Sequence, residues 1–221
     1  MASAANIAAE EELRKHEKPQ LTQEKAVAIA AELFGLELNL EKVKQLESYD
    51  DVNYYLRAVD GSQYVFKVHN GVESDNTVFL DGMQALLLHL RANGIAAPHP
   101  VNSVAGDWMT KVELPLRSGS PKQHAIRLLE FVDGEMMNEQ EVTPGLLQAT
   151  GAYMYLGNLD KVLDSFDHEG FHRSHAWDVS NTCKRTPQPH TQLDFQGHLR
   201  QAACAHSHAP QLLPVPRRAV A

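Results

Sequence analysis

The sequence predicts an α+β fold, in which helices flank an antiparallel sheet. Two runs with alternating apolar residues, "YDDVNYYLRAV" and "SQYVFKVH", are separated by Asp60-Gly61, a strong signal for a β-hairpin. Stretches with apolar residues at helical spacing lie on both sides of this hairpin. The resulting order of helices and strand pairs indicates antiparallel strands with helices packed against them.

The boundaries of the expected elements can be placed in order along the chain. The stretch "LTQEKAVAIAAELFGLEL" predicts a helix with Thr22 as its N-cap and Gly35 as its C-terminal stop. A strand in "LEKVKQLES" precedes the hairpin, and a second helix is expected from Asn76 to Asn93. Two further strands, "DWMTKVELPL" and "KQHAIRLLEF", come next. Pro144 then begins a third helix, which runs through residue 166.

Composition narrows the classes of function. The chain has 221 residues, which allows one domain or a small domain with part of another. Its net charge of −8 argues against a nucleic-acid partner, and no apolar run approaches the length of a membrane span. Residues 1–21 are expected to be a flexible tail without the apolar core of a signal peptide. We therefore expect a soluble, cytoplasmic protein.

The composition changes at Cys183. Residues 183–221 contain both cysteines, five of the eleven prolines and four of the twelve histidines, with five basic residues against the single acid Asp194. Two cysteines cannot form a disulfide framework, and a segment of this kind lacks the periodicity of a packed core. It is either a natural disordered tail or the product of an alternative exon, a retained intron or a frameshift. The second interpretation is favoured by the resemblance described below.

Lys67 lies in the middle of a run that otherwise alternates as a half-buried strand. Tyr64, Phe66 and Val68 share one face of that strand, so Lys67 points from the opposite face together with His69. One interpretation is a lysine on a solvated sheet face. The other is a lysine that reaches nucleotide phosphates, since a hairpin lysine followed by a helix with an acidic residue is the layout of kinase-like sites.

Several stretches together resemble a known family. They are "LESYDDVNYYL", "YVFKVHN", "MQALLLHLRANGIAAPHPV", "IRLLEFVDGE" and "HRSHAWDVSN". Their order and spacing resemble the aminoglycoside phosphotransferase-like kinases, in particular the hydroxylysine kinase branch, over residues 32–182. The resemblance implies a protein-kinase-like N-terminal lobe at residues 22–135 and the start of a helical C-terminal lobe at residues 136–182. Residues 183–221 would then be a tail foreign to the family.

The resemblance also implies a nucleotide site and its ligands. The "SYDDVN" stretch takes the place of the loop that covers the phosphates, and Lys67 matches the phosphate-binding lysine. Asp81 falls where the family has a helix glutamate that holds this lysine, and the backbone of "EFV" would contact the purine. The nucleotide-binding residues expected in this way are Ser48, Tyr49, Asp50, Asp51, Asn53, Lys67, Asp81, Glu130, Phe131 and Val132. The implied cofactor is GTP or ATP with Mg²⁺, and the implied acceptor is a small amine or amino acid.

The catalytic part of the family pattern is absent from these 221 residues. Phosphoryl transfer requires a carboxylate at the acceptor hydroxyl and ligands for Mg²⁺. No "HGD" of a catalytic loop occurs in the sequence, and "QLDFQG" at residues 192–197 does not qualify Asp194 as a metal ligand, because no catalytic loop precedes it. The histidines at 168, 172 and 175 are interpreted as solvated. Three alternatives stay open: a small-molecule kinase, a non-catalytic nucleotide- or partner-binding module, and a truncated isoform without function. For this chain itself we expect no catalysis.

Overall fold

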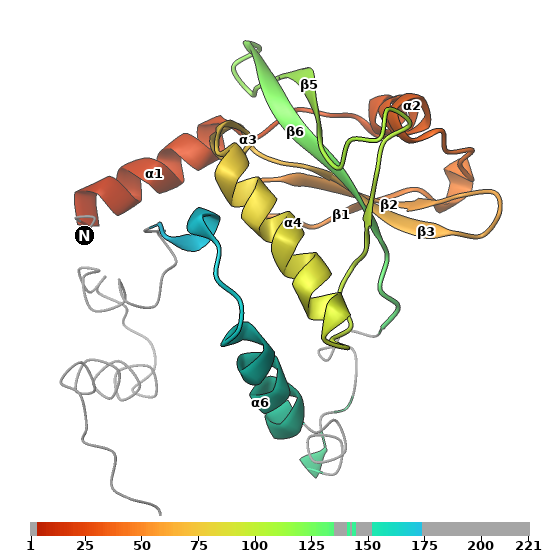
Figure 1. The fold of residues 1–221 in the computed structure, drawn as a ribbon. Helices are drawn as coiled ribbons and strands as arrows, with labels where there is room; N and C mark the ends of the chain where they lie inside the picture. The colour runs from red at the N-terminus through yellow and green to blue at the C-terminus, as the bar shows by residue number, and fades with distance from the viewer. Residues whose placement is uncertain (1–3, 135–140, 142, 145–151, 174–221) are drawn as a thin grey trace, which may run out of the picture. The chain divides into compact units, whose positions relative to one another are not determined.

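The computed structural model describes residues 4–134, 141, 143–144 and 152–173. Residues from Glu11 to Arg173 form one compact unit. Figure 1 shows its helices and strands. The helices are α1 (Ala4–His16), α2 (Gln23–Phe34), α3 (Gly71–Asp75), α4 (Thr77–Ala92) and α6 (Ala152–Leu163), with 3₁₀ turns η1 (Leu40–Lys42) and η3 (Glu169–Phe171). The strands are β1 (Lys44–Leu46), β2 (Val52–Arg57), β3 (Gln63–Val68), β4 (Pro100–Val101), β5 (Thr110–Pro115) and β6 (Pro121–Glu130).

All strand pairings in the sheet are antiparallel. β1, β2, β3 and β6 follow one another across it, and β4 and β5 pair with β6 as well. The hairpin predicted between β2 and β3 is present, and Gly61 takes a φ of 94° in its turn, a conformation that costs glycine little. The α+β prediction with an antiparallel sheet and flanking helices is therefore confirmed.

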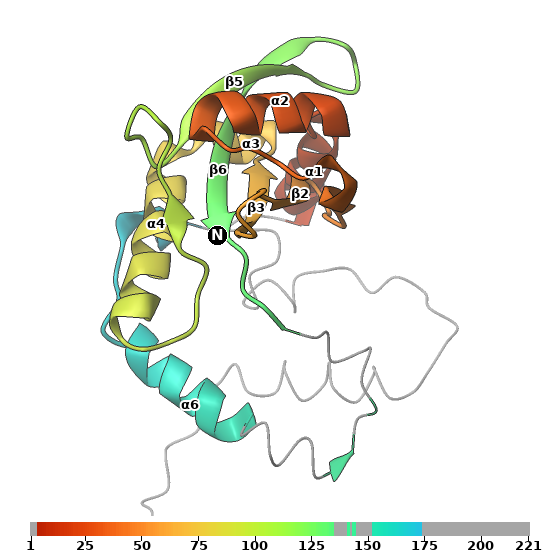
Figure 2. The same cartoon turned by 90° about the vertical axis from the view of Figure 1, so that its right-hand side faces the viewer.

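One face of the sheet carries the hydrophobic core. The residues of β2, β3 and β6 that point to this face are almost fully buried and pack against the apolar stripe of α2, which includes Ala26, Ile29 and Phe34. Figure 2 shows α2 lying across the strands. Phe34 and Phe66 meet edge to face with ring centroids 6.4 Å apart. α2 begins and ends as predicted, since the Thr22 side chain accepts a hydrogen bond from the Lys25 N–H and Gly35 closes it at a φ of 65°.

The N-terminal region differs from the flexible tail predicted for residues 1–21. Residues 4–16 form α1, because an alanine-rich, charged segment has high helix propensity. Arg14 is buried, and its guanidinium contacts carboxylates from two other parts of the chain. Gln20 donates its backbone N–H to the carbonyl of Pro115 at 2.8 Å. The tail prediction is therefore wrong for the residues from Arg14 onward.

Two more differences concern short elements. α3 was not predicted; Asn70 caps it by accepting the Glu73 N–H at 3.1 Å. The two-residue strand β4 was not predicted either. The third predicted helix is described from Ala152 onward as α6, and most of its expected first half lies outside the described residues, as does the tail from 183. No helix in the described ranges has both the length and the hydrophobicity that a membrane crossing requires.

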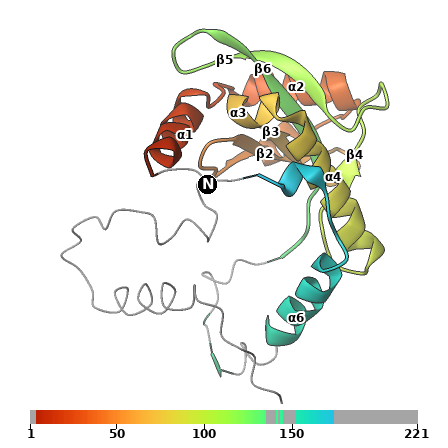
Figure 3. The ribbon, with the colours of Figure 1, turned by 60° about the vertical axis from the view of Figure 1, so that its left-hand side comes forward.

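η3, after α6, packs against α4, as Figure 3 lets the reader follow. The ring of Phe171 meets those of Phe79 and Phe166 edge to face, with centroid distances of 5.7 and 5.9 Å. A Cβ on Gly170 would stand 2.4 Å from the backbone oxygen of Val78, so only glycine permits this approach. α6 also contacts α4, through a 3.0 Å hydrogen bond between His89 Nε2 of α4 and the Val162 carbonyl of α6.

Candidate functional site

The face of the sheet opposite α2 carries a row of three polar side chains. Asn53 of β2 lies opposite Lys67 of β3, and Lys67 lies opposite Arg127 of β6. Directly opposed residues of antiparallel strands point to the same side of the sheet. Their neighbours in sequence, including Phe66 and Leu128, point into the core. The prediction that Lys67 points away from the aromatic face is thus confirmed, and we call Asn53, Lys67 and Arg127 the polar row.

Lys67 is held by a carboxylate from the β1–β2 loop (residues 47–51). Its Nζ is hydrogen-bonded to Asp51 Oδ2, and Asp51 Oδ1 accepts the backbone N–H of Asn70 at 2.9 Å. The lysine side chain retains 20% of its exposure and the aspartate 11%. A charge-assisted hydrogen bond with so little water around it fixes both groups. The carboxylate that binds Lys67 in the folded chain is therefore Asp51 of the β1–β2 loop.

The rest of the β1–β2 loop is tied to α1 and the segment after it. Arg14 Nε contacts Asp50 Oδ2 at 2.5 Å, and Arg14 Nη1 contacts Glu73 Oε1 at 2.6 Å. Lys18 Nζ donates to the carbonyls of Ser48 at 2.8 Å and Tyr49 at 3.1 Å. Although burial acts to lower the pKa of Arg14, Glu73 and Asp50 outweigh it and raise that pKa. An open depression is lined by residues of this loop together with Lys18 and Gln45.

Asp81 does not hold Lys67 in this structure. Its carboxylate is half exposed and lies 3.3 Å from Nε2 of His168, in the segment that packs onto α4. α4 instead contacts the polar row one turn later, where Gln84 Oε1 accepts a 2.6 Å hydrogen bond from Arg127 Nη2. The expected Lys67–Asp81 pair is therefore replaced by Lys67–Asp51, because the loop brings a carboxylate to the lysine directly. His168, expected to be solvated, has a carboxylate partner.

The segment expected to contact a purine lies at the end of β6. Glu130 is three residues beyond Arg127, about 10 Å along the strand at 3.3 Å per residue. Of the backbone N–H groups of Glu130, Phe131 and Val132, two already have acceptors. Glu130 donates to the carbonyl of His99 at 2.8 Å, and Phe131 donates to that of Gln63 at 2.9 Å. Among the described residues, the N–H of Val132 has no such acceptor. Val132 is half exposed and is the best placed of the three for a ligand.

His69, two residues after Lys67, is buried and neutral. Burial lowers its pKa well below 6.5, and the charges of Lys67, Arg127 and Arg14 lower it further. Asp51 Oδ2 lies 3.8 Å from His69 Nδ1, but that one carboxylate, already bound to Lys67, does not outweigh burial and three cations. Burial, and after it the positive charge around the polar row, thus both act to lower the pKa of this imidazole.

Sequence reasoning missed three residues of this region. Arg14 and Lys18 stand in the segment interpreted as a loose tail. Arg127 interrupts the apolar run "HAIRLLEF" just as Lys67 interrupts "QYVFKVHN", so the same signal was present for it. Within the described ranges, no three His, Cys, Asp or Glu side chains are grouped as a metal site would require.

Comparison with solved structures identifies the fold. The chain matches the structure of "Amicoumacin kinase hAmiN in complex with AMP-PNP, Ca2+ and Ami" with a TM-score of 0.57 and 17% identity. The match covers 93% of this chain and 57% of that one. The fold is thus that of kinase-like aminoglycoside phosphotransferases, and the antiparallel sheet with its helices is consistent with their N-terminal lobe. No protein-family model matches the chain.

Sequence comparison finds curated proteins that are similar to this chain. The chain is 30% identical over 175 residues to hydroxylysine kinase from Xenopus laevis, covering 75% of this chain and 46% of that protein. It is 27% identical over 154 residues to hydroxylysine kinase from Danio rerio, covering 70% of this chain and 42% of that protein. These likenesses support an aminoglycoside phosphotransferase-like kinase family, close to hydroxylysine kinase, for this chain. The chain spans somewhat less than half the length of these curated relatives.

Proposed function

We propose that this chain forms the nucleotide-binding lobe of a small-molecule phosphotransferase of the hydroxylysine kinase type. The observation that carries the proposal is Lys67 on the polar face of the hairpin, enclosed by the β1–β2 loop. An ammonium group in this position binds phosphate oxygens as a point charge. The lobe extends over residues 22–135 and takes in Arg14 and Lys18 before it, and residues 136–182 begin the second lobe.

The proposed ligand is GTP or ATP. Lys67 and backbone N–H groups of residues 48–51 face the phosphates, Asn53 offers a side-chain amide beside them, and Val132 lies at the purine end. The likeness to hydroxylysine kinase supports a nucleotide and a small amine or amino-acid acceptor for the complete family. The amicoumacin kinase structure holds AMP-PNP and Ca²⁺. The described residues do not group as Mg²⁺ ligands, so we derive no step through a metal.

We further propose that this chain by itself does not transfer phosphate. Its 221 residues contain no "HGD" catalytic loop, and the carboxylates that would position the acceptor and the metal are therefore not supplied by the family pattern. Losing a single positioning or electrostatic group costs several kcal/mol, and each 1.36 kcal/mol is tenfold in rate. The second candidate is a nucleotide- or partner-binding module without catalysis, and a truncated isoform without function is the third.

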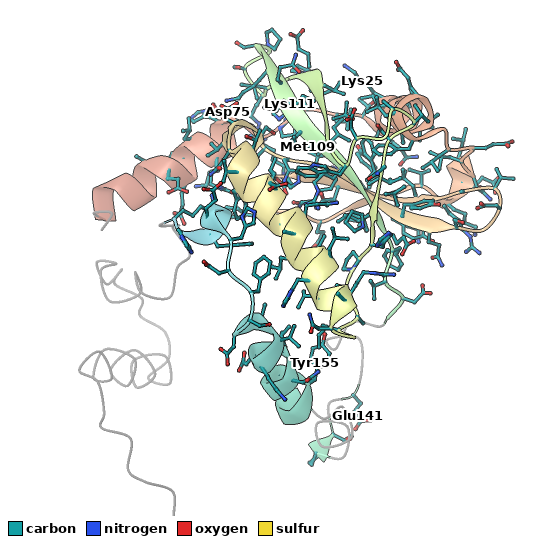
Figure 4. The ribbon with its side chains drawn as sticks, viewed as in Figure 1. Lys25, Asp75, Met109, Lys111, Glu141 and Tyr155 are labelled. Atoms are coloured by element: carbon teal, nitrogen blue, oxygen red, sulfur yellow. The ribbon has the colours of Figure 1, made fainter. Side chains whose placement is uncertain are left out.

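Binding and turnover of the purified chain separate these candidates. Fluorescent GTP and ATP analogues should bind, and Lys67→Met should weaken binding at least tenfold. Lys111→Met is the matched control, because Lys111 is exposed on β5 (Figure 4) and should leave affinity unchanged. With Mg²⁺, labelled nucleotide and 5-hydroxylysine, product should not exceed that of Lys67→Met. Equal affinity of the wild type and Lys67→Met would refute the nucleotide site, and Lys67-dependent turnover would refute the lack of catalysis.

A further inference from the structure

Arg127 is a buried cation whose hydrogen bonds are incomplete. Its side chain is 1% exposed, and Gln84 Oε1 accepts from Nη2. Nε and Nη1 are out of contact with solvent and have no acceptor among the described residues. The ring of Trp108 lies over the guanidinium, with its centroid 5.5 Å from Cζ. Leaving charged donors without acceptors in the interior is costly, so such a group marks a place where an acceptor is expected.

The neighbouring cations are matched by carboxylates, and Arg127 is not. Arg14 has Asp50 and Glu73, and Lys67 has Asp51, whereas no ion pair of Arg127 occurs in the described part of the chain. Burial lowers the pKa of Arg127 to about 10, so the guanidinium is still charged at neutral pH. Lys67 stands directly opposite on β3, and two like charges in that position repel each other. An anion bound by both cations would remove this repulsion.

We propose that Arg127 is a second cationic ligand for the phosphate groups of the nucleotide, acting beside Lys67; this inference rests on the proposed function. Opposed residues of antiparallel strands have Cβ atoms about 5 Å apart, so both cations reach the oxygens of one polyphosphate chain. The two nitrogens without acceptors among the described residues, Nε and Nη1, donate to phosphate oxygens, while the ammonium acts as a point charge. Asp51 holds Lys67 until phosphate oxygens take its place.

Trp108 provides a direct reporter of this site. The chain has two tryptophans, so Trp177→Phe leaves Trp108 as the single emitter. Titration of this full-length variant with inorganic tripolyphosphate, without metal, should shift the Trp108 emission and raise the melting temperature. Introducing Arg127→Met should weaken the tripolyphosphate response at least tenfold. Methionine is close in volume and removes a buried charge, so this variant should fold. Arg117→Met, in the exposed turn between β5 and β6, is the matched control and should respond as the parent does.

The outcomes distinguish this inference from the proposed function. A tripolyphosphate response that is equal in Arg127→Met and in the parent, or absent from the parent, overturns the role of Arg127. Loss of nucleotide binding in Lys67→Met but not in Arg127→Met overturns it too and leaves the proposed function standing. If Arg127→Met abolishes the tripolyphosphate response while GTP and ATP bind no better than tripolyphosphate, the anion site is supported and the proposed nucleotide function fails.

Discussion

The two faces of the same strands are built from different interactions. On one face, Tyr54, Phe66 and Leu128 are 0–1% exposed and pack against α2. On the other, Asn53, Lys67 and Arg127 stand next to them in sequence and carry polar contacts that are only partly complete. Burial of apolar surface stabilises the first face, whereas the second keeps charges out of water, which costs stability. Substitutions at adjacent residues such as Phe66 and Lys67 should therefore change different properties: the first should change folding stability, and the second should change ligand binding.

The largest effect on stability should come from the apolar face. Phe66→Ala removes a fully buried ring in contact with Phe34 and should lower the free energy of unfolding by about 3–5 kcal/mol. Lys67→Met should cost only about 1 kcal/mol, because Asp51 keeps the backbone N–H of Asn70 as a donor and the repulsion between Lys67 and Arg127 is relieved. Urea unfolding of both variants measures the difference. If Lys67→Met is as destabilising as Phe66→Ala, the polar face is structural and the comparison fails.

A smaller loss is expected for Arg14 of α1, whose charge is balanced by two carboxylates. Arg14→Met leaves Asp50 and Glu73 without their main partner and should cost about 3 kcal/mol, the lower end for a buried pair. The loss stays at this end because Arg173 Nη2 still reaches Glu73 Oε1 at 3.2 Å. Arg57→Met, at an exposed position at the end of β2, is the control and should be near neutral in the same urea titration. Equal unfolding midpoints for the two variants would contradict this account.

The smallest effect is a dependence on pH. The pKa of His69 is lowered by burial and by three nearby cations, so below pH 6.5 the unfolded chain binds a proton that the folded chain does not. The contribution of His69 to the free energy of unfolding is therefore complete above pH 6.5. It falls as the pH decreases toward the folded pKa, by at most about 1.4 kcal/mol per pH unit for one histidine. His124, whose pKa burial also lowers, adds to the same slope.

His69→Gln tests the origin of this slope. The variant should show a shallower loss of unfolding free energy between pH 6.5 and 5 than the wild type, while His16→Gln, at an exposed position of α1, should keep the full slope. Urea titrations at four or five pH values suffice. A wild-type slope that survives in His69→Gln would assign the acid sensitivity to other groups.

The sheet was predictable from sequence because its signals are local. Alternation in "SQYVFKVH" and the Asp60-Gly61 turn determine the β2–β3 hairpin, and parity alone places Lys67 opposite the core. Thr22 and Gly35 bound α2 through caps that depend on a few neighbouring residues. Such features do not depend on distant parts of the chain.

The partners of the charged groups were not predictable in this way. Asp51 and Asp81 are both acids near Lys67 in sequence, and only the docking of the β1–β2 loop decides between them. Arg14 binds Glu73, which lies 59 positions away in the sequence, and no local pattern predicts a contact over that separation. The resemblance to a kinase family supplied the nucleotide hypothesis, whereas Arg127 required the cross-strand register to be known.

The register of β3 also determines where the chain tolerates changes in its length. Side chains alternate between the two faces, so one residue inserted between Ser62 and Lys67 would turn the lysine into the core and Phe66 out of it. The same insertion in the turn at residues 116–120 would lengthen an exposed loop and leave both faces unchanged. Homologous chains that differ in length are therefore expected to vary at this turn and to keep the spacing from Gly61 to Lys67.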